Sequence, residues 1–321
     1  MTAKPRIAIA IGDPAGIGPE IALKAALNRG VREFCEPIIV GDTEVLARYA
    51  HTLRKTPPEN IVDLGAMNVN FLTPGESDAA CGRAILEYAG RAIDMATSGE
   101  VDAVVACPQT QSSIKSAGIE FDGYPSYVAK RTGTDPDDVF MMLVSDRLRI
   151  AHVTLHVGVR KALDMIDHER IVRTLKAADV ALKRIGIASP RIAVSGIDPH
   201  AGEGGLFGSD DIEIVAPAIA EARNAGIDAS GPFGADTMYL DESFDAYTVM
   251  FHDQGHIPAK LIGFTGTAAF AIGTPILFSS VAHGSALDIA GKGKADPSAL
   301  IWTLKQISGA ARQPRLVSST R

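Results

Sequence analysis

The chain begins with a buried strand that ends in a glycine-rich turn and leads straight into a helix, and this feature constrains its fold most. Residues 6–11 (RIAIAI) form a near-continuous apolar run, typical of a strand buried on both faces. The turn spans residues 12–20 (GDPAGIGPE), and Pro19 suits the first turn of the helix that follows. Such a turn lets a ligand approach the backbone and places an anion at a helix N-terminus, although a tight strand–helix connection explains it equally well. It is not the GxGxxG dinucleotide pattern.

The same alternation of strand, loop and helix continues along the chain and predicts an α/β protein with a parallel sheet. Further strands are expected at residues 37–40, 101–107, 191–194, 247–251, 268–272 and 276–281. Residues 139–144 and 148–154 are expected to be adjacent strands that can pair antiparallel. Helices are expected from residue 43 and over residues 77–98, 167–184, 212–225 and 297–311, whereas residues 52–75 read as irregular.

Length and composition narrow the class of protein. A chain of 321 residues is long enough for two domains or one large α/β unit, and a net charge of −7 argues against nucleic acid as a partner. The odd number of cysteines, without CxxC spacing, is typical of a reducing compartment rather than a disulfide framework. No apolar run reaches the roughly 18 residues of a membrane span, and no signal peptide is evident. We therefore expect a cytoplasmic protein without a membrane partner.

Residues 248–260 (TVMFHDQGHIPAK) hold the densest group of chemically active side chains. We expect a strand that ends in a polar loop, which is where α/β enzymes place their chemistry. His252 and Asp253 can bind a metal or move a proton, and Lys260 can hold an anionic group of a substrate. His256 is either a substrate contact or a plain loop residue. The competing interpretation is a solvated loop without function.

Three histidines follow predicted strands, far apart in the sequence: His156, His200 and His252. Neutral imidazoles bind divalent transition metals, and three of them leave coordination positions open for substrate or water. No local HxH or HExxH spacing is present, so each histidine taken singly is better explained as structural. Their joint position along one carboxyl edge of the sheet favours a metal site.

Four motifs, in order along nearly the whole chain, resemble those of the 4-hydroxythreonine-4-phosphate dehydrogenase family: GDPAGIGPE, DPHAGEGG, HDQG and HGSALDIAGKG. The last motif also resembles the nucleotide loop of isocitrate and isopropylmalate dehydrogenases. The resemblance implies two α/β/α domains of that fold with a cleft between them. One would comprise residues 1–124 and 270–321, with the nucleotide loop. The other, residues 125–269, would hold the metal ligands and the dimer interface.

The resemblance also implies the cofactors and the assembly. His156, His200 and His252 correspond to the metal ligands of the family, which are shared between dimer partners, so an obligate homodimer with shared active sites is expected. One divalent metal is expected per active site, Zn²⁺ first, with Mg²⁺ or Co²⁺ as alternatives. NAD is the expected second cofactor, and its lining residues would be Gly284, Ser285, Asp288 and Asp296.

The departures from the family pattern concern the phosphate site. Phosphate-handling members carry His-Thr where this chain has Tyr124-Pro125, His-Lys where it has Thr110-Gln111, and Asn and Arg where it has Ala269 and Phe278. Loss of the arginine is the most informative change, because a bidentate guanidinium suits a phosphate. The motifs GYPS, HDQGH and SSVAHGSA resemble instead the terephthalate dihydrodiol dehydrogenase branch, whose place is in aromatic catabolism. An aromatic-lined pocket is therefore expected.

This branch oxidises and decarboxylates a cis-dihydroxy-cyclohexadiene dicarboxylate to protocatechuate with NAD. A metal would lower the pKa of the substrate hydroxyl, and the ketone formed by hydride loss is β to a carboxylate, so CO₂ can leave. Candidate residues for catalysis are Lys260, Asp253 and Asp236, and candidate substrate contacts are Tyr124, Thr110, Lys260 and His256. The alternatives are 4-hydroxythreonine-4-phosphate dehydrogenase, a dehydrogenase of another phosphorylated hydroxy acid, and a binding protein that has lost catalysis.

Overall fold

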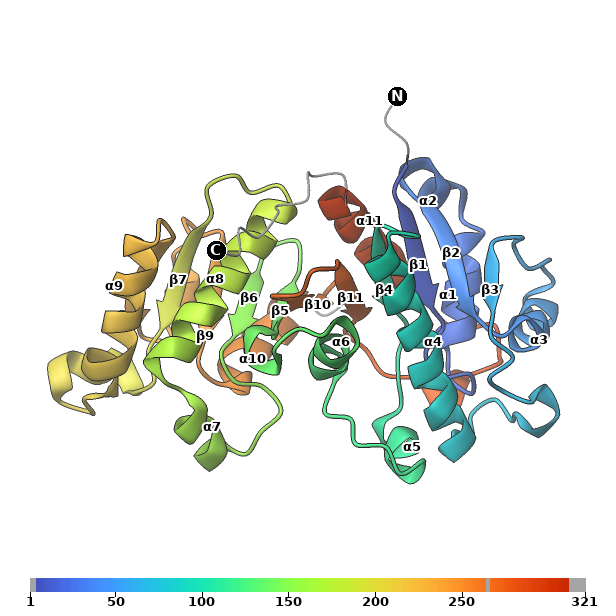
Figure 1. The fold of residues 1–321 in the computed structure, drawn as a ribbon, viewed down its shortest axis with the longest axis horizontal. Helices are drawn as coiled ribbons and strands as arrows, with labels where there is room; N and C mark the ends of the chain where they lie inside the picture. Colours follow the sequence, from blue (N-terminus) through green and yellow to red (C-terminus); the bar gives the residue numbers. More distant parts are fainter. Residues whose placement is uncertain (1–3, 264–265, 312–321) are drawn as a thin grey trace. The chain divides into compact units, whose positions relative to one another are not determined.

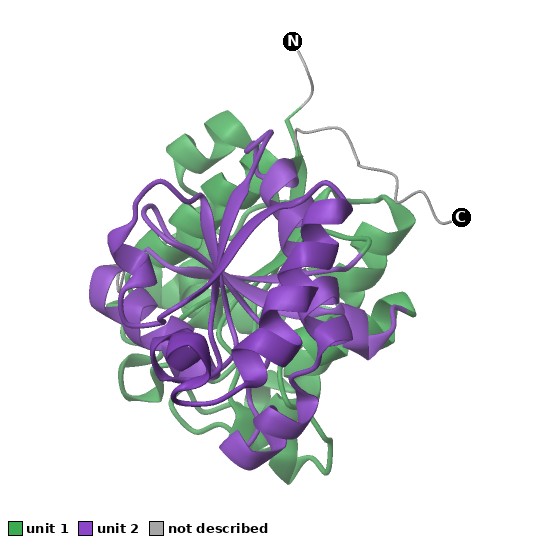
Figure 2. Ribbon diagram, turned by 90° about the vertical axis from the view of Figure 1, so that its left-hand side faces the viewer, with its two compact units in different colours: residues 1–133, 275–312 green, residues 134–274, 313–321 purple. Residues whose placement is uncertain are grey.

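The structure is a computed structural model that describes residues 4–263 and 266–311. These residues divide into two compact units, coloured separately in Figure 2. Unit 1 extends to Gly133 and resumes at Pro275, and unit 2 comprises Thr134–Thr274. The boundaries expected from the sequence, after residues 124 and 269, therefore precede these by a few residues. Figure 1 labels most of the helices and strands.

Unit 1 contains a parallel sheet in the order β3-β2-β1-β4-β11. Because connections between parallel strands are right-handed, the helices after β1 and β2 cover one face, and α4, which returns from β3 to β4, covers the other. Accordingly α1 packs on α3, and α4 packs on β1, β2 and β4. The elements of unit 1 are β1 (Arg6–Ala10), α1 (Gly18–Ala26), α2 (Arg29–Phe34), β2 (Glu36–Gly41), α3 (Thr43–Leu53), β3 (Ile61–Asp63), η1 (Val69–Phe71), α4 (Ala79–Ser98), β4 (Ala103–Ala106), α5 (Gln111–Ser116), α6 (Tyr124–Thr132), β11 (Phe278–Val281), η6 (Leu287–Ile289) and α11 (Ser298–Ala311).

Unit 2 contains strands in the order β10-β5-β6-β9-β7-β8. Strand β5 is antiparallel to both of its neighbours, and β6, β9, β7 and β8 run parallel to one another. The antiparallel pairing of β5 with β6 was expected from the sequence and is confirmed. The elements of unit 2 are η2 (Pro136–Asp138), β5 (Phe140–Val144), β6 (Arg149–His152), α7 (Val159–Met165), α8 (His168–Arg184), β7 (Arg191–Ser195), η3 (Pro199–Gly205), η4 (Asp211–Val215), α9 (Ala216–Asn224), β8 (Asp228–Phe233), η5 (Met238–Leu240), β9 (Ala246–Val249), α10 (His252–Gly263) and β10 (Ala268–Ile272).

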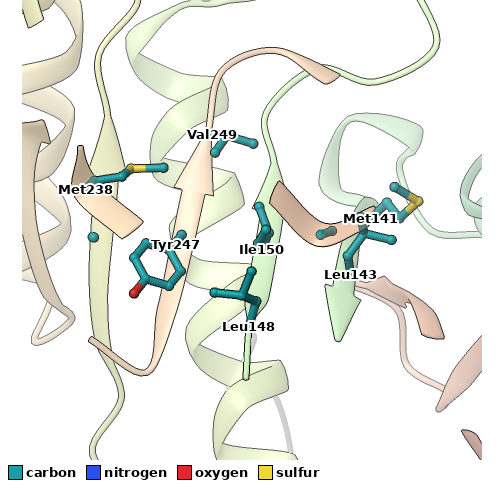
Figure 3. Packing of buried hydrophobic residues seen from close by; sticks show 9 residues of the cluster. Met141, Leu143, Leu148, Ile150, Met238, Tyr247 and Val249 are labelled. Atoms are coloured by element: carbon teal, nitrogen blue, oxygen red, sulfur yellow. The ribbon is translucent and has the colours of Figure 1, made fainter. Parts of the chain in front are cut away.

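One face of the unit 2 sheet packs against α10 through alternate residues of its strands. Ile150 of β6 and Val249 of β9 are fully buried there, beside Met141 of β5 and Ala259 of α10 (Figure 3). Because strand side chains alternate between faces, the even-numbered residue His152 follows Ile150 onto the same face. Helix α10 is thereby fixed against β6 and β9, and its first turn lies at the ends of these strands.

The predicted fold class, α/β with two α/β/α units, is confirmed, whereas two local expectations are wrong and some short elements were not expected. The stretch 52–75 contains the short strand β3, and α2 was missed because it has only six residues. The polar segment after β9 is not a loop, since α10 begins at His252. No helix among the described residues is both long and apolar enough to cross a membrane.

Candidate functional site

The three predicted metal-binding histidines all lie at one edge of the unit 2 sheet. His156 follows β6, His200 follows β7 and His252 follows β9, and these three strands are parallel neighbours. The carboxyl ends of parallel strands meet at the same edge, where open α/β sheets bind their ligands. The sequence prediction of a shared edge is therefore correct.

Helix α10 presents three candidate residues on one face. His252, His256 and Lys260 are spaced by four residues, so their side chains lie in a row along the helix. The rings of His252 and His256 are stacked, with centroids 3.7 Å apart and an interplanar angle of 9°. Lys260 is exposed in the last turn, beyond the two imidazoles. The row thus combines two imidazole rings with one ammonium group.

Helix α10 continues through Pro258 because a tertiary contact replaces the hydrogen bond that proline cannot donate. In a regular helix the carbonyl of Gln254 would accept from the N–H of residue 258. Here the hydroxyl of Tyr239 donates to that carbonyl at 2.8 Å. Tyr239 lies outside the sequence of α10, so its contact cannot be predicted from that sequence alone. Proline and glycine in this stretch therefore indicated a loop.

The imidazole of His252 is oriented by its neighbour. Its Nδ1 lies 2.7 Å from Oδ1 of Asp253, which directs the Nε2 lone pair outward for a ligand. The ring centroid of His156 lies 5.6 Å from that of His252. These two side chains can share a small ligand, and Asp253 has the position of a group that orients a metal ligand.

The histidine rings behind His252 are uncharged at neutral pH. Burial, followed by the nearby His252, lowers the pKa of His256 to about 4, and its Nδ1 donates to the carbonyl of His252. His152, which was not among the predicted site residues, is fully enclosed, and burial lowers its pKa to about 3. Neither His256 nor His152 therefore adds a positive charge beside the proposed metal position.

The remaining two residues of the HDQG motif, Gln254 and Gly255, have structural roles. The side-chain oxygen of Gln254 accepts the N–H groups of Met250 and Phe251, and its amide donates to the carbonyl of Gly196. This side chain therefore ties the start of α10 to the end of β7. Gly255 is needed for close packing, since a Cβ there would lie 2.3 Å from Nε2 of His152.

The loop that carries His200 has an unusual backbone. Residues 200–204 all have positive φ, including 54° for His200 and 44° for Glu203. Non-glycine residues rarely adopt this conformation, which often marks a functional site. The buried carboxylate of Asp211, also missed by the sequence reasoning, accepts the N–H groups of Ile197 and Asp198 at 2.8 and 3.0 Å. Asp211 thus holds the base of the loop.

The three histidines do not form a complete metal site within the part of the chain that the structure describes. No group of three His, Cys, Asp or Glu residues there lies close enough to hold a metal ion. His200 is exposed and has its ring contact with Phe207 rather than with another histidine. Chemically the donors fit a divalent transition metal, because neutral imidazoles with outward lone pairs are typical ligands. Asp236 is exposed in the turn before η5, close to Gly234. A Cβ placed on Gly234 would lie 3.7 Å from the Cα of His200.

At the carboxyl edge of the unit 1 sheet, polar side chains from three loops meet. Asp13 follows β1, Thr110 follows β4 and Ser285 follows β11. Oγ1 of Thr110 lies 2.5 Å from Oδ2 of Asp13 and 2.8 Å from Oγ of Ser285. Asp13 is fully buried and was not among the predicted site residues, although its position directly after a buried strand was a usable signal.

The predicted nucleotide loop lies between β11 and α11 and is held by α1. The buried carboxylate of Glu20 accepts the N–H groups of Gly293 and Ala295, and Lys24 donates to the carbonyls of the same two residues. Four residues of the loop region were predicted to line the cofactor: Gly284, Ser285, Asp288 and Asp296. Gly284, Asp288 and Asp296 are exposed, and Ser285 is buried.

Two of the predicted cofactor-lining residues are exposed carboxylates, Asp288 and Asp296. Asp288 is exposed in η6, and its backbone carbonyl accepts from Lys292. Asp296 has a second role at the start of α11, because its Oδ1 accepts the N–H and hydroxyl of Ser298. These two hydrogen bonds lower the pKa of Asp296.

The expected aromatic side chains contact one another in unit 1 but are not open pocket walls. The ring centroids of Tyr124 and Phe278 lie 5.1 Å apart, and those of Tyr124 and Phe121 lie 5.6 Å apart. Phe278 is 1% exposed and is a core residue of β11. Among the described residues the buried hydroxyl of Tyr124 has no hydrogen-bond partner, and burial raises its pKa, so it remains a neutral donor. Ala269 packs against the core of unit 2.

The family model for the pyridoxal phosphate biosynthetic protein PdxA matches residues 33–307. The chain belongs to this family. A solved 4-hydroxythreonine-4-phosphate dehydrogenase from Klebsiella pneumoniae is 34% identical, with a TM-score of 0.85 over 96% of this chain and 100% of that one. The fold and family expected from the motifs are therefore confirmed, and PdxA-type relatives make this chain a dehydrogenase that acts on CH–OH groups.

Two further relatives carry the name of another substrate. The 1,2-dihydroxy-3,5-cyclohexadiene-1,4-dicarboxylate dehydrogenase of Comamonas sp. is 43% identical over 93% of this chain and 96% of that protein. A solved terephthalate 1,2-cis-dihydrodiol dehydrogenase from Burkholderia xenovorans is 42% identical, with a TM-score of 0.72 over 96% and 98% of the two chains. The 4-hydroxythreonine-4-phosphate dehydrogenase of Desulforapulum autotrophicum is 38% identical over 99% of this chain and 98% of that protein.

Proposed function

We propose that this chain is a metal-dependent NAD dehydrogenase that oxidises and decarboxylates terephthalate 1,2-cis-dihydrodiol to protocatechuate. The observation that carries the proposal is the contact between Phe278 and Tyr124. The family resemblance assigns an arginine and a histidine of the phosphate-handling members to these positions, and here both are buried aromatic rings. A core phenylalanine cannot hold a phosphate, whereas a dicarboxylate of a flat ring does not need that clamp.

The second candidate is oxidation of a phosphorylated hydroxy acid such as 4-phosphohydroxythreonine. The 38% identity to the Desulforapulum enzyme favours it. Of the phosphate-binding side chains of that branch only Lys260 is retained, exposed near the end of α10. A single lysine is a point charge and gives a phosphate no planar, bidentate partner, so this candidate ranks second.

The metal would be held by His156, His200 and His252, with His200 supplied by the partner of a homodimer. Within the described residues the three histidines do not converge on one point, and the ring of His200 contacts Phe207 instead, which supports this arrangement. So do large exposed apolar side chains around the loop of His200 and on α10, since such surfaces mark interfaces: Leu206, Phe207, Ile212, Ile257 and Leu261. A bound divalent metal would supply Lewis acidity at the substrate hydroxyl.

The side chains have separate tasks in the proposed reaction. Asp253 holds the ring of His252 in the ligand orientation, and His256 stays neutral and packs behind it. Lys260 pairs with a substrate carboxylate. Asp236, near the loop of His200, orients that loop or moves a proton. The nucleotide loop of unit 1 binds NAD, which accepts the hydride. The resulting ketone is β to a carboxylate, so CO₂ leaves, and the product gains aromaticity.

The test is NADH formation by purified protein offered the cis-dihydrodiol and 4-phosphohydroxythreonine in parallel, with and without a metal chelator. We expect chelator-sensitive activity on the dihydrodiol and none on the phosphorylated compound. Activity on the phosphorylated compound alone would reject the proposed substrate. Chelator-resistant activity on the dihydrodiol would reject the metal.

The metal ligands are tested by His200→Ala, with His168→Ala as the matched control. His168 lies in the same unit and pairs with Glu221 at 2.7 Å on the surface of α8. We expect His200→Ala to lose both metal content and turnover, and His168→Ala to keep both. A metal-loaded, active His200→Ala enzyme would remove His200 from the site.

A further inference from the structure

The turn of residues 12–20 (GDPAGIGPE) is filled by groups of the protein itself. The N–H of Ile17, the N-cap residue of α1, donates to the carbonyl of Ser285 at 2.9 Å. Gly16 packs against the same residue, since a Cβ there would lie 2.8 Å from Cβ of Ser285. The hydroxyl of Tyr49 donates to the carbonyl of Gly16 at 2.9 Å. The position that an anion would take at this helix N-terminus is therefore held by the Ser285 carbonyl.

Two side chains of α1 hold the other end of the nucleotide loop. Oε2 of Glu20 accepts the N–H of Gly293 at 3.1 Å, and Oε1 accepts the N–H of Ala295 at 2.8 Å. Nζ of Lys24 donates to the carbonyls of the same two loop residues at 3.1 and 2.6 Å. Each of these loop residues is thus bound to α1 through both its N–H and its C=O.

Glu20 and Lys24 hold the loop as a pair. The carboxylate of Glu20 is 1% exposed, so its charge needs donors that replace water, and two loop N–H groups and the Lys24 ammonium supply them. Their spacing of four residues, with the glutamate nearer the N-terminus, is the favourable order on a helix. Loss of the lysine would leave the buried carboxylate short of a donor, and loss of the carboxylate would leave two N–H groups without an acceptor.

The segment between the two attachment points carries a residue predicted to line the cofactor. Ser285, Gly293 and Ala295 are fixed by α1, so residues 286–292 form a bridge between fixed ends. Asp288 is exposed within this bridge. A loop that is ordered before its ligand arrives binds more tightly, because the entropy cost of ordering it is not subtracted from the binding free energy.

We propose that Ile17, Glu20 and Lys24 form a loop anchor, and that Glu20 and Lys24 are positioning residues for NAD. This inference rests on the proposed function, which places NAD at the nucleotide loop. The two side chains contact the backbone of the loop, and they set the affinity for NAD through the conformation of residues 285–295. The turn that resembles an anion site in the sequence therefore serves the cofactor without binding its phosphates.

The loop anchor is tested by fluorescence titration of the purified protein with NADH. Lys24→Met keeps a long side chain but removes the ammonium group. We expect its Kd for NADH to rise about 10- to 100-fold, the factor that corresponds to a hydrogen bond with a charged group. Lys24→Arg keeps donors and should recover most of this loss. Lys183→Met is the matched control, because Lys183 forms an ion pair of the same spacing with Asp179 in α8 of unit 2.

Steady-state kinetics separates positioning from a general loss of function. In Lys24→Met and in Glu20→Gln, KM for NAD⁺ should rise with the Kd for NADH, whereas kcat at saturating NAD⁺ should stay close to the wild-type value. The double variant should be little worse than the weaker single variant, because both side chains act on the same two loop residues. A lower kcat with unchanged KM would contradict a positioning role.

Limited proteolysis follows the loop without activity or NADH. Trypsin cleaves after lysine, and Lys292 and Lys294 are exposed in the loop. We expect faster cleavage there in Lys24→Met than in the wild type or Lys183→Met. Wild-type NADH affinity in both Lys24→Met and Glu20→Gln, or cleavage at the wild-type rate, would overturn the loop anchor. A wild-type protein that binds no NADH would contradict the proposed cofactor, and faster cleavage in Lys24→Met would still show that α1 holds the loop.

Discussion

The absence of a side chain at Gly255 lets α10, which carries His252 and His256, pack closely on β6. A Cβ at this position would lie 2.3 Å from Nε2 of His152 and 2.9 Å from Cγ2 of Ile150, both fixed in β6. Alanine favours a helix over glycine by about 0.8–1 kcal/mol, but overpacking costs about 1–3 kcal/mol, and at this distance the overlap dominates. We therefore expect Gly255→Ala to lower the free energy of unfolding in urea.

The control for this substitution is Gly309→Ala. Gly309 is exposed in α11, and a Cβ there meets nothing within 4 Å. Only helix propensity changes, so the free energy of unfolding should rise by about 0.5–1 kcal/mol. Equal stabilisation by both variants would show that α10 can move away from His152 without cost.

Asp211 acts on His200 through the backbone, and its loss should weaken metal binding without removing a ligand. Asp211→Ala leaves the buried N–H groups of Ile197 and Asp198 without their acceptor. Groups that orient metal ligands typically contribute 10- to 100-fold to affinity, so we expect a weakening of about that size in competition with a colorimetric chelator. Asp210→Ala is the matched control, since Asp210 is exposed and makes no side-chain cap of η4. Equal affinity of both variants would contradict the role of Asp211.

The sequence predicted the position of the candidate histidines better than the side chains that hold their loops. His156, His200 and His252 were predicted at one sheet edge, because parallel strands end together whatever their separation in the chain. Asp211 and Glu20 were not predicted. Their partners are backbone N–H groups of distant loops, whose direction depends on conformations that side-chain identity does not encode.

At the scale of elements, long periodic segments were predictable, and those set by tertiary contacts were not. Helix α8 was expected within a residue of its bounds, and α4 within two, because their apolar faces are long and regular. Helix α10 was read as a loop, because His252, Asp253, Gly255 and Pro258 are poor helix formers. Its continuation depends on the Tyr239 hydroxyl and on burial of Ala259 against the sheet, neither of which is local information.

The first turn of α4 should make stability depend on pH. The side chain of Asp78 caps this helix by accepting the N–H of Cys81 at 2.9 Å, and this bond lowers the pKa of Asp78. Because the folded pKa lies below the unfolded value of about 3.9, the ionised cap stabilises the fold above that pH, and the stabilisation is lost as pH falls through the folded pKa. Asp78→Ala should cost about 1 kcal/mol at neutral pH.

Asp78→Asn separates the charge from the hydrogen bond of the cap. Asparagine caps a helix about as well as aspartate but carries no charge at the positive end of the helix dipole. The advantage of the wild type over this variant, measured by urea unfolding, should therefore shrink as pH is lowered below about 4. An advantage that is constant with pH would mean that the charge of Asp78 does not stabilise α4.

At the scale of the whole molecule, the proposed metal site is complete only in a dimer, so activity depends on dimerisation. In unit 2, Leu261 of α10 is 80% exposed, and Leu206, beside the loop of His200, is 72% exposed. A second copy of the chain that covers these side chains would remove apolar surface from water and bring a third imidazole to His156 and His252. Dimerisation and metal binding should therefore be lost together.

Leu261→Arg tests this coupling, with Phe71→Arg as its matched control. Phe71 is 79% exposed in η1, which belongs to unit 1 rather than to the unit that carries the three histidines, and its replacement changes charge and apolar surface equally. A charge placed in an apolar interface lacks a partner and costs several kcal/mol. We expect Leu261→Arg to be monomeric by light scattering and to lose most of its metal, and Phe71→Arg to remain a metal-loaded dimer. A monomeric Leu261→Arg enzyme with full metal content would show that one chain completes the site by itself, and a dimeric, metal-loaded one would place the interface elsewhere.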